Sequence, residues 1–175
     1  AYTLAELGNA YDLGLASSFK TAFEKLGGKV IAENFPTNQA DFTSYITNAK
    51  SNGAQAIFAP TSISYAQLII EAAATQGLKI PLYAGDTWDS NVILAAAKGK
   101  DVQVNVTTFY QEGGNKEFDE GFKKWLNADS SRLTNNGGND IVSAVSAMGY
   151  DSYFTALEAI KAAGSGDSQK IMEAL

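Results

Sequence analysis

Apolar runs alternate with amphipathic stretches along the first hundred residues. The runs typical of buried strands are 2–7, 30–31, 56–59 and 82–84. The stretches with apolar residues on one helical face are 11–26, 42–49 and 65–72, and a glycine follows each of them. Strands and helices that alternate at this spacing predict an α/β fold, a parallel sheet with helices on both faces.

In such sheets, ligands bind beyond the carboxyl ends of the strands. The predicted strand ends are 6–11, 60–64 and 85–88. Candidate ligand contacts are therefore expected in these three segments.

The pattern changes in the second half of the chain. Residues 102–106 alternate strictly, as a strand with one wetter face does. The later predictions are a helix over 118–126, a loop over 130–139, a long helix over 141–163 and a last helix over 168–175. Because no further strands follow, we expect a boundary near 107–113 between an α/β unit and a helical unit.

Charge and composition remove several classes of function. The 175 residues carry 13 basic and 19 acidic side chains, a formal net charge of −6, which disfavours binding to nucleic acid phosphates. Histidine and cysteine are absent. Disulfides and Ser-His-Asp triads are therefore excluded. Because thiolate and imidazole ligands are missing, a zinc site is not expected, and no other metal or cofactor is expected.

The chain lacks the common nucleotide-binding and nucleophile motifs. Neither G-x-G-x-x-G nor G-x-x-x-x-G-K-[ST] occurs, and there is no G-x-S-x-G elbow. Asp12 and Asp86 could approach each other at the sheet edge, which is what an enzyme using carboxylates would need. On the helix over 118–126, Asp119 and its charged neighbours are expected to form a solvated face.

Asp86 lies directly after a predicted strand. A carboxylate there can accept a charge-assisted hydrogen bond from an ammonium group, or it can form a turn. Asp89 and Ser90 are better placed to cap the next helix, which leaves Asp86 for a ligand. Trp88 can line the same site or belong to the core.

Other polar side chains lie at the first and third strand ends. Tyr11 can pack on a ligand and donate its hydroxyl, or it can pack locally at the start of its helix. Thr61, Ser62 and Ser64 can bind a polar group or cap the following helix.

An ordered set of motifs resembles one known family. The segments are 9–14, 27–30, 41–43, 77–79, 85–90 and 149–151. In order and spacing they are similar to the branched-chain amino acid binding proteins. These are type I periplasmic binding proteins, the receptor subunits of ABC importers.

The resemblance implies an organisation in two α/β lobes joined by a hinge. Residues 1–108 would be most of the second lobe. Residues 109–175 would return through the hinge and add helices to an incomplete first lobe. The sequence begins at Ala1 without a visible signal segment and ends inside a predicted helix, so we expect a piece of a longer protein.

The resemblance also implies a ligand site between the lobes. Tyr11 would supply an aromatic contact, and Asp86 would hold the α-ammonium of an amino acid. Ser62 and Val145 align with further pocket positions, and Ser62 is smaller than the tyrosine of some relatives. Thr61 and Trp88 complete the predicted set.

The function implied is capture of an amino acid, branched-chain or otherwise small, and delivery to a membrane permease. The location would be extracytoplasmic, either periplasmic or as a cell-surface lipoprotein. No enzymatic activity and no nucleic acid partner are expected. The alternative is a ligand-sensing domain of the same fold in a receptor or regulator.

The helices after residue 110 carry apolar side chains without a sheet to pack on. These are Phe118, Phe122, Trp125, Val145 and Tyr153. We expect this face to self-associate or to fold back on the strand unit.

Overall fold

The computed structural model describes residues 1–175 and divides them into two compact units. Unit 1 comprises Ala1–Thr108 and contains every strand. Unit 2 comprises Phe109–Leu175 and is helical. Each unit is described by itself below.

Unit 1 is built on a parallel sheet. Its strands are β1 (Tyr2–Glu6), β2 (Ile31–Phe35), β3 (Ile57–Phe58), β4 (Leu82–Ala84) and β5 (Val104–Val106). They lie in the order β2-β1-β3-β4-β5, and every neighbouring pair is parallel. The predicted α/β fold class is therefore confirmed, with β5 shorter than the alternating pattern at 102–106 indicated.

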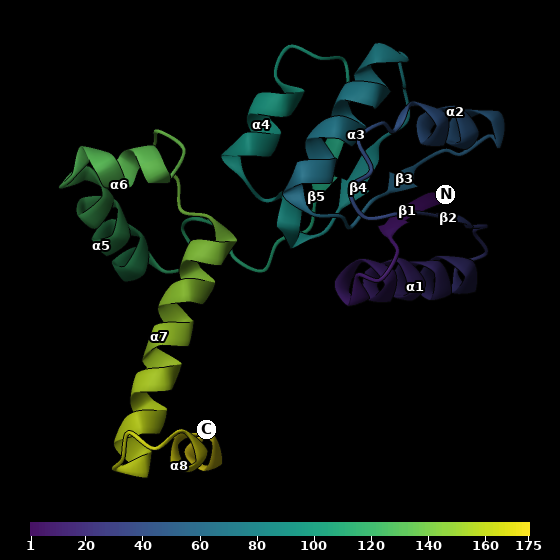
Figure 1. Cartoon of the computed structure of the whole chain (residues 1–175). Coiled ribbons are helices and arrows are strands. Elements are labelled where there is room, and N and C mark those ends of the chain that lie inside the picture. The colour runs from purple at the N-terminus through teal and green to yellow at the C-terminus, as the bar shows by residue number, and fades with distance from the viewer. The chain divides into compact units, whose positions relative to one another are not determined.

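Helices cover both faces of this sheet (Figure 1). They are α1 (Ala10–Lys25), α2 (Thr43–Ser51), α3 (Ile63–Thr75) and α4 (Asn91–Ala97), with the short 3-10 helix η1 at Asp86–Trp88. On the face of α1, Phe19 stacks on Phe58 of β3 with 4.6 Å between ring centroids. On the opposite face, Leu4 of β1 joins Ile46 of α2 and Ile70 of α3 in the main core.

Local capping fixes where helices begin. The side chain of Asn9 accepts hydrogen bonds from the backbone N–H groups of Tyr11 and Asp12, which starts α1 immediately after β1. Ser90 caps α4 in the same way through the N–H of Val92, as its position predicted. Because these caps stand next to strand ends, they also determine which side chains reach the carboxyl edge of the sheet.

Unit 2 consists of α5 (Lys116–Asn127), α6 (Ser130–Asn135), α7 (Ala144–Ala163) and α8 (Ser168–Ala174). The predicted loop over 130–139 is wrong in its first half. There, Asp129 accepts the N–H of Ser131 at 2.8 Å and starts α6. The long helix begins at Ala144 rather than 141, because Ser143 caps it.

Asp119 corrects a second expectation. Its carboxylate is buried, not solvated, and accepts the Tyr110 hydroxyl at 2.6 Å and the Gly113 N–H at 2.7 Å. It therefore holds the segment before α5 onto that helix. None of the helices in the structure combines the length and apolar character needed to cross a membrane.

Candidate functional site

The strand order of unit 1 creates a switch point between β1 and β3. The chain passes from β1 outward to β2 and then returns across β1 to β3. The helices that follow β1 and β3 therefore lie on opposite faces, and their loops diverge at the carboxyl edge. Crevices at such points are the usual ligand sites of open parallel sheets.

Tyr11 and Asp86 meet at this edge. Tyr11 lies in the first turn of α1, and Asp86 begins η1 directly after β4. The Tyr11 hydroxyl donates a hydrogen bond to Oδ1 of Asp86. The contact joins the first and fourth strand ends, which sequence spacing could not place side by side.

Two features support this hydrogen bond. Burial, the hydrogen bond to Asp86 and the charge of that carboxylate raise the pKa of Tyr11 to about 12, so its hydroxyl stays protonated as a donor. Gly85 leaves the space that the ring needs, since a Cβ there would lie 2.7 Å from the Tyr11 oxygen. Tyr11 is 38% exposed, so its ring is open to a ligand.

Trp88 and Thr61 are structural neighbours of that pair. The indole Nε1 of Trp88 donates to the Thr61 carbonyl at 3.0 Å, and the Thr87 hydroxyl donates to the same carbonyl at 2.8 Å. These bonds fasten η1 to the end of β3. Trp88 is 1% exposed and belongs to the core, which is one of the two roles expected for it. Contact of Trp88 with a ligand stays a prediction.

The hydroxyls after β3 do not all act as caps. Ser62 is the N-cap residue of α3, yet its side chain caps no helix N–H. Its Oγ instead lies 2.9 Å from Oγ of Ser64. Oγ1 of Thr61 is fully buried without a hydrogen-bond partner. The hydroxyls of Thr61 and Ser62 therefore both have hydrogen-bonding capacity that the structure does not use.

Glu6 forms a second contact across the same edge, and the sequence did not predict it. The Tyr65 hydroxyl of α3 donates to Oε1 of Glu6 at 2.9 Å, and Asn9 donates to Oε2 at 3.4 Å. A charged residue that closes the buried run Leu4–Ala5 was the available signal. Its partner lies 59 residues further along the chain and could not be inferred.

Asp12 is engaged below Glu6. Its Oδ2 accepts the backbone N–H of Glu6 at 3.1 Å, and its Oδ1 is buried without a partner. Burial, with a further contribution from the nearby charge of Glu6, raises the pKa of Asp12. Asp12 and Asp86 thus have separate hydrogen-bond partners and share no bond of the kind that an acid–base pair would need.

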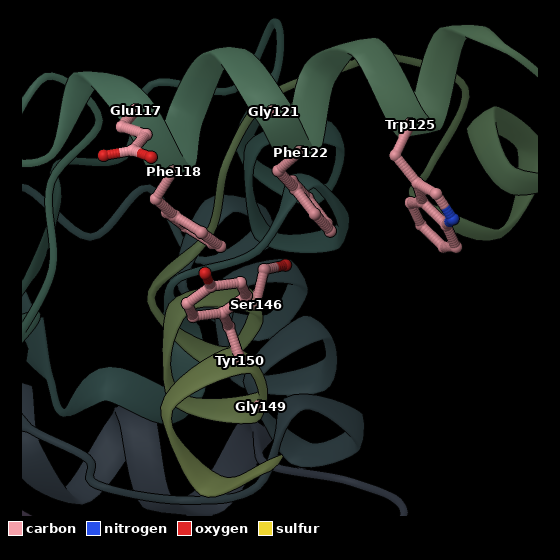
Figure 2. A pocket seen from close by; sticks show the side chains of 8 residues that line it. All are labelled: Glu117, Phe118, Gly121, Phe122, Trp125, Ser146, Gly149 and Tyr150. Atoms are coloured by element: carbon pink, nitrogen blue, oxygen red, sulfur yellow. The ribbon is translucent and has the colours of Figure 1, made fainter. Parts of the chain in front are cut away.

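Val145 lies in unit 2, on the first turn of α7, and is half exposed. Beside it on the same helix, Ser146, Gly149 and Tyr150 line a hollow of 630 Å³ whose other wall is α5. Figure 2 shows Phe118, Phe122 and Trp125 in a row along α5, with Tyr150 facing them. The rings stack with centroid distances of 5.6 and 5.8 Å along the row.

Nothing in the structure groups three or more His, Cys, Asp or Glu residues so that they could hold a metal ion. What the edge of unit 1 offers is carboxylate oxygens, hydroxyls and an aromatic ring. This combination suits a ligand with an ammonium group and an apolar part.

Known proteins share this chain's sequence pattern and fold. The family profile described as "Periplasmic binding protein" matches residues 1–175. Leu/Ile/Val-binding protein homolog 1 of Brucella suis biovar 1 (strain 1330) is 29% identical over 166 residues, which are 94% of this chain and 42% of that protein.

Solved structures agree with this match. The leucine binding protein LivK from Thermotoga maritima MSB8 has a TM-score of 0.82 at 26% identity, and the match covers 99% of this chain and 47% of the LivK chain. The substrate binding protein LivJ from Streptococcus pneumoniae, in complex with isoleucine, has the same fold, with a TM-score of 0.75 at 21% identity and coverages of 99% and 47%.

The chain spans less than half the length of these relatives. The matches confirm the resemblance to branched-chain amino acid binding proteins expected from the ordered motifs. Because the profile match runs along the whole sequence, the chain belongs to the periplasmic binding protein family.

Proposed function

We propose that this chain is part of the extracytoplasmic receptor of an ABC importer and that its ligand is an amino acid, branched-chain or otherwise small. The observation that carries the proposal is the Tyr11–Asp86 pair at the carboxyl edge of unit 1. The names of the relatives, which refer to leucine, isoleucine and valine, support the same ligand class.

The two units have distinct roles in this proposal. Unit 1 is most of the second lobe, and unit 2 returns through the hinge to add helices to the first lobe. The hinge lies near 107–110, where the chain passes from one unit to the other. The ligand binds between the two lobes of the natural protein, with Val145 as a contact from the first lobe.

Capture follows from the chemistry of the edge. Asp86 accepts hydrogen bonds from the α-ammonium group, and the Tyr11 hydroxyl fixes the carboxylate in place before the ligand arrives. The Tyr11 ring covers the apolar part of the ligand, while Ser62, which is partly exposed, supplies a polar contact beside it. Closure of the lobes about the hinge then excludes water and presents a closed form to the permease.

A thermal-shift panel of the standard amino acids tests this proposal, with the protein at its natural length. At about 100 times its dissociation constant, a ligand adds about 2.7 kcal/mol of stability, which raises the melting temperature by several degrees. We expect that shift with small apolar amino acids and expect Asp86→Asn to abolish it.

Asp41→Asn is the matched control. It removes the same charge from an exposed residue beyond β2 and keeps an oxygen that can accept the Thr43 N–H. Its shift should equal that of the unmodified protein. If no amino acid shifts the melting temperature, or if Asp86→Asn behaves like Asp41→Asn, the proposal is wrong.

A further inference from the structure

The chain passes from unit 1 to unit 2 between Thr108 and Phe109. On the unit 1 side, the N–H and the hydroxyl of Thr107 both donate to the Ala84 carbonyl, at 3.1 and 3.2 Å. The Thr108 hydroxyl donates to Oδ2 of Asp89 at 2.7 Å. A hydrogen bond to a carboxylate is stronger than one between neutral groups. The chain is therefore fastened to unit 1 up to its last residue.

Asp89 also belongs to the segment that carries Asp86. It is the residue that ends η1, and its backbone N–H donates to the Asp86 carbonyl at 2.9 Å. The side chains between them, Thr87 and Trp88, both donate to the Thr61 carbonyl. The segment η1 is thus bonded to the end of β3 through Thr61 and to the end of unit 1 through Asp89.

Tyr110 is held on the other side of the boundary. Its hydroxyl donates to Oδ1 of Asp119 at 2.6 Å, and its ring lies edge-on to Phe118 of α5 with 5.8 Å between centroids. Asp119 is 6% exposed, and its Oδ2 accepts the Gly113 N–H at 2.7 Å. The Tyr110 hydroxyl also accepts the Asn115 N–H at 3.3 Å. Tyr110 is therefore fastened to α5 and to the loop before it.

One residue, Phe109, lies between these two anchors. Its side chain is 53% exposed, and it belongs to no helix or strand. Motion between two compact units is absorbed by the backbone dihedral angles of a few such residues. Because Thr108 and Tyr110 are bonded to different units, the backbone rotations left for this motion lie at and beside Phe109.

We propose that Asp89 and Asp119 are positioning residues for ligand capture. By holding the residues on either side of Phe109, they confine the hinge to its backbone. Asp89 also joins this hinge to the segment that carries Asp86. Fewer backbone conformations are then lost when the lobes close on a ligand, which favours binding. This inference rests on the proposed function and goes beyond it by naming the side chains that limit the movement of the lobes.

Thr108→Val and Tyr110→Phe test the two anchors, because each removes a hydroxyl and keeps nearly the same side-chain shape. The readout is the distribution of distances between spin labels in the protein at its natural length, without ligand. The labels are attached to cysteines introduced at the exposed positions Lys20 in unit 1 and Lys161 in unit 2. We expect each variant to broaden the distribution. Thr108→Ser retains the hydroxyl and should leave it unchanged.

Calorimetric titration with leucine supplies a second readout. Each of the two variants should weaken leucine binding roughly three- to tenfold, because closure then has to order a longer stretch of backbone. Asp89→Ala should have the same effect as Thr108→Val. The double variant should bind no more weakly than either single one, since both changes remove the same bond.

Two matched controls remove a hydroxyl far from the boundary. The Thr134 hydroxyl donates to the Ser130 carbonyl at 3.0 Å within α6, and Tyr153 is exposed on α7. Thr134→Val and Tyr153→Phe should leave both the distance distribution and the leucine affinity unchanged. Melting curves show that each variant is folded.

The outcomes separate this inference from the proposed function. If either anchor variant gives the same distances as its control, the inference is wrong, and amino acid binding stands as long as leucine binds. The inference is also wrong if the distances broaden while the leucine affinity is unchanged. If no amino acid binds to the unmodified protein, the proposed function fails and this inference fails with it.

Discussion

The hydroxyl of Tyr11 illustrates how one atom organises the site. It connects the helix after β1 to the carboxylate after β4, and thereby sets Asp86 before any ligand is present. Tyr11→Phe removes this hydroxyl and keeps the ring. We expect amino acid binding to weaken roughly tenfold, as for the loss of one hydrogen bond to a charged group. Calorimetric titration measures the change, and unchanged affinity would show that Asp86 needs no such support.

The same hydroxyl predicts a pH dependence. The pKa of Tyr11 rises from 10.0 to about 12 on folding, so the folded state holds its proton more tightly than the unfolded state does. The resulting stabilisation is fully present below pH 10 and is lost as the pH rises through 12. Burial also raises the pKa of Tyr45 and Tyr110. Ultraviolet titration should therefore show one fewer late-ionising tyrosine in Tyr11→Phe than in the unmodified protein. If the late phase keeps its full amplitude in the variant, the assignment is wrong.

Gly85 tests the geometry without removing a polar group. A Cβ at this position would meet the Tyr11 oxygen at 2.7 Å and Cδ1 of Leu15 at 3.2 Å. Gly85→Ala should displace the Tyr11 side chain and weaken ligand binding. Gly14→Ala in α1 is the control. Its Cβ meets nothing within 4 Å, and it should raise stability by about 0.5–1 kcal/mol with binding unchanged.

At the scale of elements, the sequence predicted what depends on local pattern. Ile57–Phe58 was expected as a strand from its apolar run, and the last helix was expected over 168–175, where α8 lies. The short helix α6 was missed, because it is polar and its start depends on the single cap Asp129. Asp119 was misjudged because its partners, Tyr110 and Gly113, lie outside its helix.

The site was predictable in part for the same reason. Tyr11 and Asp86 were each expected from their positions at strand ends, but their contact depends on strand order. The Glu6–Tyr65 contact depends on it too and could not be foreseen. Local spacing therefore indicates which residues reach the edge, whereas tertiary order decides which of them meet.

Trp88 tests how η1 is held. Trp88→Phe loses the indole hydrogen bond to the Thr61 carbonyl and leaves a small cavity in the core. We expect a loss of about 1–3 kcal/mol in the free energy of unfolding, measured by urea denaturation. Trp125→Phe makes the same change at a half-exposed position and should cost less than about 0.5 kcal/mol. Equal losses would contradict this role of Trp88.

At the scale of the whole molecule, unit 2 leaves large apolar side chains exposed. Trp125, Val145 and Tyr153 are each more than half exposed, and the aromatic row of α5 borders an open hollow (Figure 2). We expect the isolated chain to self-associate reversibly with concentration and Trp125→Ser to weaken this association. Light scattering measures both. A monomer at every concentration would contradict self-association. The remaining expectation would then be that this apolar face packs on the strand unit of the same chain.

Asp86 is the residue proposed to bind the α-ammonium group of an amino acid. Calorimetric titration of the protein at its natural length with leucine, and with isocaproate as the analogue lacking the ammonium group, tests it most directly. We expect leucine to bind and isocaproate to bind at least tenfold more weakly. We also expect Asp86→Asn to lower the affinity for leucine while leaving the affinity for isocaproate unchanged or higher. Equal binding of leucine and isocaproate, or leucine binding that is unaffected by Asp86→Asn, would contradict it.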